Sequence, residues 1–112
     1  MATVGKNLSS FDSNELPNGA RYKVGIVVSE WNREFTEAMK NGAVDLLKSA
    51  GVPEDSITIK WVPGSFELPL GAQMMLDSSI LNLDGVIAIG SVIRGETAHF
   101  DYVCSTAAQG IK

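Results

Sequence analysis

The sequence has few of the residues that build disulfides, metal centres or membrane spans. Its only cysteine, Cys104, has no partner for an internal disulfide, which favours a reducing, cytoplasmic setting. With one histidine and one cysteine there is no Cys/His cluster at metal-ligand spacing, so no metal is expected. The apolar runs fall far short of the roughly 20 residues that span a bilayer, and MATVGKNLSS has no apolar signal-peptide core. We therefore expect no membrane partner.

Positive charge is also scarce. The 9 Lys and Arg residues against 13 Asp and Glu give a net charge of -4, and no basic run occurs. Because nucleic-acid binding depends on clustered cations that neutralise phosphates, we expect no nucleic acid as a partner. The sequence also has no P-loop, no GxGxxG element and no GxSxG element. These absences leave nucleotide binding and serine-hydrolase chemistry without support.

The composition that remains is that of one globular domain, with 45% hydrophobic and 20% charged residues. Residues 1–20 mix Ser, Asn, Asp, Pro and Gly without periodicity. They are expected to form an N-terminal arm, either disordered or paired with a neighbouring subunit. Residues 21–112 are expected to form the folded domain.

Strand and helix patterns alternate through this domain. β-branched apolar segments predict buried strands over 21–30, 56–62 and 86–93. Helix-period patterns follow each strand over 32–50, 68–80 and 100–111. Asn32 is a preferred residue type for a helix N-cap, and Gly51 with Pro53 marks the end of the first helix. This order predicts an α/β three-layer sandwich with a mostly parallel sheet and helices on both faces.

Each helix is expected to turn its apolar stripe toward the sheet. The first stripe consists of Phe35, Ala38, Met39, Ala43, Leu46, Leu47 and Ala50. The second consists of Leu68, Ala72, Met75, Leu76 and Ile80, and the third of Phe100, Val103, Cys104, Ala107, Ala108 and Ile111. Cys104 is accordingly interpreted as a small core residue rather than a nucleophile.

Ligands of open parallel sheets bind beyond the carboxyl ends of the strands. The turns at that edge are SEWNRE, VPGSFELP and GSVIRGETAHF. In the first, Trp31 either stacks on a heteroaromatic ring or covers the end of the sheet. In the second, Glu67 either accepts hydrogen bonds from hydroxyls or only complements a helix dipole.

The third turn contains residues suited to an anion and to proton transfer. Gly95, Glu96 and Thr97 either present donors to an anion or supply only a helix cap. His99 follows in the first turn of the predicted helix, where it serves either as a proton-transfer group or as a structural residue.

Together the turns carry a family resemblance. From Tyr22 to Lys112 the chain resembles the 6,7-dimethyl-8-ribityllumazine synthase family of riboflavin biosynthesis, most specifically in VPGSFELP and GSVIRGETAHFDYV. The resemblance implies a flavodoxin-like sheet and a transferase without metal or organic cofactor. It implies condensation of 5-amino-6-(D-ribitylamino)uracil with 3,4-dihydroxy-2-butanone 4-phosphate, two small-molecule substrates. It also implies a homo-oligomer, a pentamer or an icosahedral assembly.

The resemblance further implies a role for each site residue. Trp31 and Asn32 match the residues that stack on the pyrimidine ring. The residues that match those contacting the pyrimidine and ribityl chain are Ser65, Phe66, Glu67, Ser91, Val92 and Ile93. Glu96 and Thr97 match the residues that hold the butanone phosphate, and His99 matches the proton-transfer residue.

Members of the family continue beyond the residue that matches Lys112. The continuation contains a fourth strand, a further aromatic, a phosphate-binding arginine and a closing helix, so 21–112 corresponds to the domain without its C-terminal strand and helix. Arg33 and Arg94 are the cations nearest the predicted site, and neither is assigned to phosphate. The alternative function is a non-catalytic assembly or flavin/lumazine-binding subunit on the same scaffold.

Overall fold

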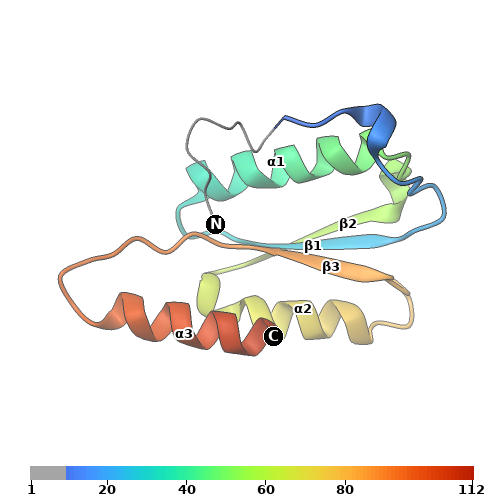
Figure 1. The fold of residues 1–112 in the computed structure, drawn as a ribbon. Helices are drawn as coiled ribbons and strands as arrows, with labels where there is room; N and C mark the ends of the chain where they lie inside the picture. Colours follow the sequence, from blue (N-terminus) through green and yellow to red (C-terminus); the bar gives the residue numbers. More distant parts are fainter. Residues whose placement is uncertain (1–9) are drawn as a thin grey trace.

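A parallel sheet of three strands lies between two layers of helix in the computed structural model, which describes residues 10–112 (Figure 1). The strands are β1 (Val24–Ser29), β2 (Ile57–Val62) and β3 (Gly85–Ile89), in the order β2-β1-β3. Helix α1 (Arg33–Ser49) covers one face, and α2 (Leu68–Asp77) and α3 (His99–Ile111) cover the other. The predicted α/β sandwich with a parallel sheet is confirmed.

The central strand β1 is buried on both faces because its side chains are apolar at consecutive positions. Ile26, Val27 and Val28 are fully buried. Since successive side chains point to opposite faces, Ile26 and Val28 belong to a cluster with Ala43, Val44 and Leu47 of α1. On the other face, Val27 packs with Leu68 and Met75 of α2. One strand therefore anchors both helical layers.

The sheet register brings the ends of all three strands to one edge. Ser29 lies opposite Val62 of β2, and Val28 lies opposite Ile89 of β3. The third strand is shorter than the sequence predicts, because β1 leaves the sheet at Ser29 and gives residues beyond Ile89 no strand to pair with. Residues 90–98 accordingly cross the edge as irregular chain.

The predicted inner face of α1 is wrong in part. Phe35 is 53% exposed and Met39 45% exposed, and Ala38 and Leu46 are also exposed. The helix contacts the sheet instead through a neighbouring stripe that includes Thr36, Ala43, Val44 and Leu47. Both stripes recur at three- and four-residue steps, so periodicity alone does not decide which of them faces the core.

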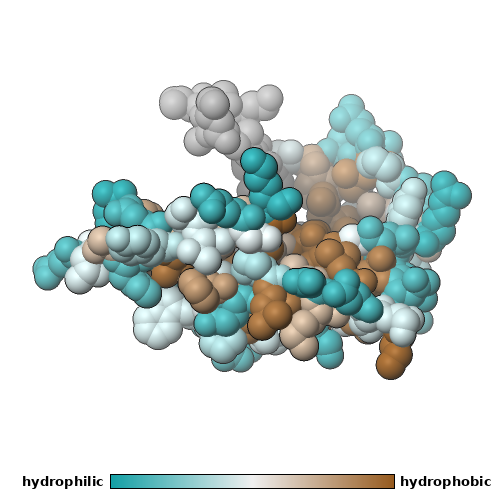
Figure 2. Space-filling model, turned by 90° about the horizontal axis from the view of Figure 1, so that it is seen from below, coloured by the Kyte–Doolittle hydropathy of each residue, from teal (hydrophilic) through white to brown (hydrophobic). Residues whose placement is uncertain are grey.

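The other two helices also differ from their predicted stripes. Leu76 is exposed although it lies within α2, and Ile80 is 91% exposed because α2 ends at Asp77 with Ser78 in an extended conformation. In α3, Val103 is buried as predicted and Cys104 is half-buried, but Ala108 and Ile111 are exposed. Figure 2 views this side of the molecule, where hydrophobic residues gather among hydrophilic ones.

The predicted arm lies partly outside the described residues, which begin at residue 10. Its final part contacts the C-terminal end of α1, where the Gly19 N–H donates to the Ala50 carbonyl at 2.7 Å. Pairing of the arm with a neighbouring subunit stays a prediction. Within residues 10–112, no helix has both the length and the apolarity to cross a membrane.

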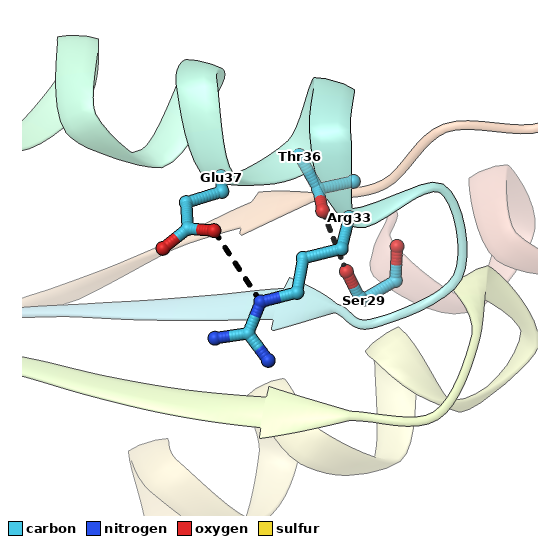
Figure 3. Close-up of polar contacts among 4 residues, drawn as sticks. All are labelled: Ser29, Arg33, Thr36 and Glu37. Atoms are coloured by element: carbon cyan, nitrogen blue, oxygen red, sulfur yellow. Dashed lines mark hydrogen bonds and ion pairs between the residues drawn. The ribbon is translucent and has the colours of Figure 1, made fainter.

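Two polar side chains, Ser29 and Thr36, are fully buried where β1 passes into α1. The Thr36 hydroxyl donates to the Ser29 carbonyl at 2.8 Å, and this bond closes the turn between strand and helix (Figure 3). On the solvent side, Arg33 Nε lies 3.4 Å from Glu37 Oε2. Because the exposed pair is screened by water, the buried Thr36 bond is the stronger constraint on the turn.

Replacing the buried threonine by valine tests this constraint. Thr36→Val keeps the side-chain shape but removes the donor, so the unfolding free energy should fall by about 1–3 kcal/mol in urea denaturation. Thr106→Val, on the exposed side of α3, is the control and should change it by less than about 0.5 kcal/mol. Equal effects of the two substitutions would contradict the assignment.

Candidate active site

A cavity of about 490 Å³ lies at the carboxyl edge of the sheet, within the usual size range of small-molecule sites. All three strand-to-helix connections contribute to its wall. Its lining consists of Trp31, Pro63, Gly64, Ser65, Phe66, Glu67, Ser91, Val92, Ile93, His99 and Val103. Trp31, Glu67 and His99, which are far apart in the sequence, therefore meet around one space.

Most of the site residues named from the sequence line this cavity, but Asn32, Glu96 and Thr97 do not. Asn32 precedes α1 and is half-buried, and Glu96 and Thr97 are exposed in the irregular segment. Val103 is predicted from the sequence only as a core residue, although its position four residues after His99 places both on one side of α3. This helical spacing is the signal in the sequence from which Val103 could have been assigned to the site.

The first wall is an exposed aromatic ring on a fixed backbone. Trp31 is 70% exposed, which disfavours the interpretation that it covers the end of the sheet. The backbone N–H of Trp31 donates to the Pro63 carbonyl at 3.0 Å, and its backbone carbonyl accepts from the Ser29 hydroxyl at 3.4 Å. An aromatic face held in this way is suited to stacking on a planar ligand.

The second wall is the 3₁₀-helix Ser65–Glu67. Glu67 Oε2 accepts from the Gly64 N–H at 2.9 Å, so the carboxylate stabilises the turn and its second oxygen is the natural acceptor for a ligand hydroxyl. Ser65 is 6% exposed, and its Oγ has no hydrogen-bond partner within the described part of the chain. A buried hydroxyl without a partner costs about 1–3 kcal/mol, which a polar ligand group would offset.

The third wall begins with residues 91–93 and ends at His99, the first residue of α3. The backbone N–H of His99 donates to the Thr97 hydroxyl at 3.3 Å, while Ala98 occupies the N-cap position. Thr97 therefore stabilises the start of α3 without being its N-cap. His99 is exposed, and its imidazole makes no hydrogen bond to residues 10–112. Such a ring is free to form a hydrogen bond with a ligand.

The two arginines near this edge are engaged with aromatic rings. The Arg33 guanidinium lies 4.3 Å from the centroid of the Trp61 ring, and that of Arg94 lies 4.9 Å from the Phe100 ring. Arg94 also lies 3.8 Å from Asp101 at the surface. Each guanidinium therefore lies over an aromatic ring, and neither arginine lines the cavity. In the described residues, no group of three His, Cys, Asp or Glu side chains is placed to hold a metal ion.

The second and third walls approach each other closely at Gly90. A Cβ atom built on Gly90 would lie 2.5 Å from Ser65 Oγ and 2.7 Å from Leu68 Cδ1. Both distances are shorter than real contacts, so a side chain at Gly90 would force the Ser65 hydroxyl and the Leu68 methyl group to move. The position of the Ser65 wall relative to the sheet thus depends on the absence of a side chain at Gly90.

This fold and cavity define an α/β protein with a small-molecule site at the carboxyl edge of a parallel sheet. A family model described as 6,7-dimethyl-8-ribityllumazine synthase matches residues 21–112. The chain belongs to the 6,7-dimethyl-8-ribityllumazine synthase family, as the sequence resemblance predicts.

Curated relatives carry the same description, 6,7-dimethyl-8-ribityllumazine synthase. The relative from Flavobacterium johnsoniae is 54% identical over 100% of this chain and 58% of its own length. That from Parabacteroides distasonis is 48% identical over 99% of this chain and 68% of its own length. The relative from Christiangramia forsetii is 50% identical over 100% of this chain and 66% of its own length. The chain thus spans 58% to 68% of the length of these relatives.

Adding a methyl group at Gly90 tests the close approach of the two walls. Gly90→Ala should force the Ser65 turn or β3 to move and lower the unfolding free energy by about 1–3 kcal/mol. Gly85→Ala, in the same strand with open space around its Cβ, is the matched control and should retain wild-type stability in the same denaturation experiment. If Gly90→Ala were as stable as Gly85→Ala, the two walls would not be in contact.

Proposed function

We propose that the protein condenses 5-amino-6-(D-ribitylamino)uracil with 3,4-dihydroxy-2-butanone 4-phosphate to 6,7-dimethyl-8-ribityllumazine, releasing phosphate and water. The observation that carries this proposal is the cavity in which Trp31, Glu67 and His99 meet. Family membership supports the choice of reaction, because a stacking ring, a hydroxyl acceptor and a proton-transfer group are what these two substrates require.

The pyrimidine substrate lies between the Trp31 ring and the opposite wall. Stacking on an exposed indole holds the heteroaromatic plane without a charge. The unpartnered Ser65 hydroxyl and the Glu67 carboxylate supply hydrogen-bonding groups for the polar ring and the ribityl hydroxyls. Phe66 and residues 91–93 complete the apolar and backbone surface around the ligand.

The butanone phosphate lies toward the third wall, next to His99. Glu96 and Thr97 stand in the exposed chain directly before α3, outside the lining of the cavity. A phosphate held there would lie at the outer end of the cavity while the reacting carbonyl points inward. His99 then transfers protons between the condensing amine, the carbonyl and the departing groups.

Most of the rate enhancement is expected from orientation of two substrates, which contributes up to roughly 7–11 kcal/mol, with acid–base help of roughly 10²–10⁴-fold. Support for this division comes from the site, because hydrogen bonds hold its walls and His99 is the one imidazole among the lining residues. Substitution of His99 should therefore slow the reaction without abolishing it.

We also propose that the protein is a cytoplasmic homo-oligomer, a pentamer or an icosahedral assembly of pentamers. The support for oligomerisation is the exposed apolar stripe of α1, formed by Phe35, Met39 and Leu46. An apolar surface of this kind favours burial against another subunit. The single cysteine, without an internal disulfide, supports a reducing compartment.

The assay that tests the reaction follows lumazine formation by absorbance with the full-length protein and both substrates. His99→Ala should lower kcat by about 10²–10⁴-fold and leave measurable turnover. Glu34→Gln, at an exposed position of α1 away from the cavity, is the control and should retain the wild-type rate. A wild-type rate in His99→Ala would remove His99 from the mechanism.

Titration calorimetry distinguishes the enzyme from a binding subunit. The enzyme should bind both lumazine and inorganic phosphate saturably. Lumazine binding without phosphate binding or turnover would instead identify a flavin/lumazine-binding subunit and contradict the proposed reaction.

The oligomer is tested by a charge placed on the apolar stripe of α1. Met39→Glu should reduce the assembly mass measured by sedimentation, because burying a carboxylate at an interface is unfavourable. Asn41→Glu, exposed on another side of the same helix, should leave the mass unchanged. A wild-type protein that sediments as a monomer would contradict the proposal.

A further inference from the structure

Asn32 combines an unusual backbone conformation with an unusual side-chain partner. It precedes α1 with φ 59 and ψ 45, a left-handed conformation in which asparagine is enriched among non-glycine residues. An asparagine at this position ordinarily caps the helix, but the Asn32 side chain makes no cap hydrogen bond. Instead, Nδ2 donates to the Ser91 carbonyl at 3.1 Å, across 59 residues of sequence.

This hydrogen bond joins two walls of the cavity where the sheet no longer holds them. The pairing of β1 with β3 ends at Val28 and Ile89, so it does not reach Trp31 or Ser91. On the β2 side, by contrast, backbone bonds continue beyond the strands through Glu30 to Val62 and Trp31 to Pro63. Within residues 10–112, the hydrogen bond donated by the Asn32 carboxamide links the Trp31 turn to the Ser91 segment.

The placement of Asn32 separates it from the ligand. Its neighbours Trp31 and Ser91 line the cavity, but Asn32 does not. It is half-buried, and one donor hydrogen of its carboxamide is directed to a protein carbonyl rather than to the space between the walls. Asn32 therefore lies behind the cavity wall, in contact with the Ser91 segment.

We propose that Asn32 is a positioning residue that sets the separation between the Trp31 ring and the backbone of residues 91–93. This inference depends on the proposed function for its substrate, and it replaces the stacking role that the resemblance implies for Asn32. A site whose walls are held before binding does not spend binding energy on ordering them. Loss of the hydrogen bond between Asn32 and Ser91 should therefore weaken pyrimidine binding, although no substrate contact is removed.

The test uses two substitutions that keep the backbone and remove the donor. Glycine and aspartate both tolerate a left-handed conformation, so Asn32→Gly and Asn32→Asp each remove the Nδ2 donor without forcing the turn to refold. Far-UV circular dichroism checks that both fold. Glu34→Gln, exposed near the start of α1, is the matched control.

The first readout is hydrogen exchange of the ligand-free protein, measured by mass spectrometry. Both Asn32 variants should speed exchange in residues 90–98 by about 2- to 10-fold, the range that one hydrogen bond confers. Exchange in residues 63–67 should match that of the wild type, because the backbone bonds on that side remain. Unchanged exchange in residues 90–98 would overturn the proposal, because a residue that only contacts substrate has no effect without it.

The second readout is steady-state kinetics. Both variants should raise KM for the ribitylaminouracil by about 2- to 10-fold, with a smaller change in kcat, because proton transfer by His99 is intact. A fall in kcat alone, with unchanged KM, would also overturn the positioning role. If the wild type does not form lumazine, the proposed function fails, while the exchange comparison still decides whether Asn32 holds the two segments together.

Discussion

Parallel pairing of β1 with both of its neighbours is the constraint on which the rest of the structure depends. Because all three strands point the same way and end in register, the connections that follow them emerge at one edge. The pairing is stable because β1 is apolar on both faces, with Ile26, Val27 and Val28 fully buried beneath α1 and α2. A hydrophobic requirement of the core thus decides where the chemistry of the protein is located.

The pairing alone does not complete the site, because the strands stop before the residues that line it. Toward β2, backbone bonds from Glu30 and Trp31 extend the alignment into the turns. Toward β3, the alignment depends on side chains: the Asn32 carboxamide reaches the Ser91 carbonyl, and the missing side chain of Gly90 lets the chain pass against Ser65. The two sides of the cavity are therefore held by different means, and the β3 side is the more sensitive to single substitutions.

The sequence predicts the features that follow from local pattern. The apolar run of β1 and the glycine just beyond the end of α1 can both be identified in it. The sheet face of α1 and the end of α2 are not, because they depend on which apolar stripe packs better and on where Ser78 becomes extended. The Asn32–Ser91 contact has no sequence signal either, because its partners are 59 residues apart and its acceptor is a backbone carbonyl.

The exceptions to folding rules at the carboxyl edge have a common explanation. An indole that is 70% exposed, a hydroxyl buried without a partner in the described chain, and an asparagine in a left-handed conformation each disfavour the folded state on their own. All three lie in or beside one cavity, next to the apolar core that Ile26, Val27 and Val28 of β1 form. Natural proteins depart from local consistency mainly where function requires it. A ligand that stacks on Trp31 and bonds to Ser65 would remove two of these costs.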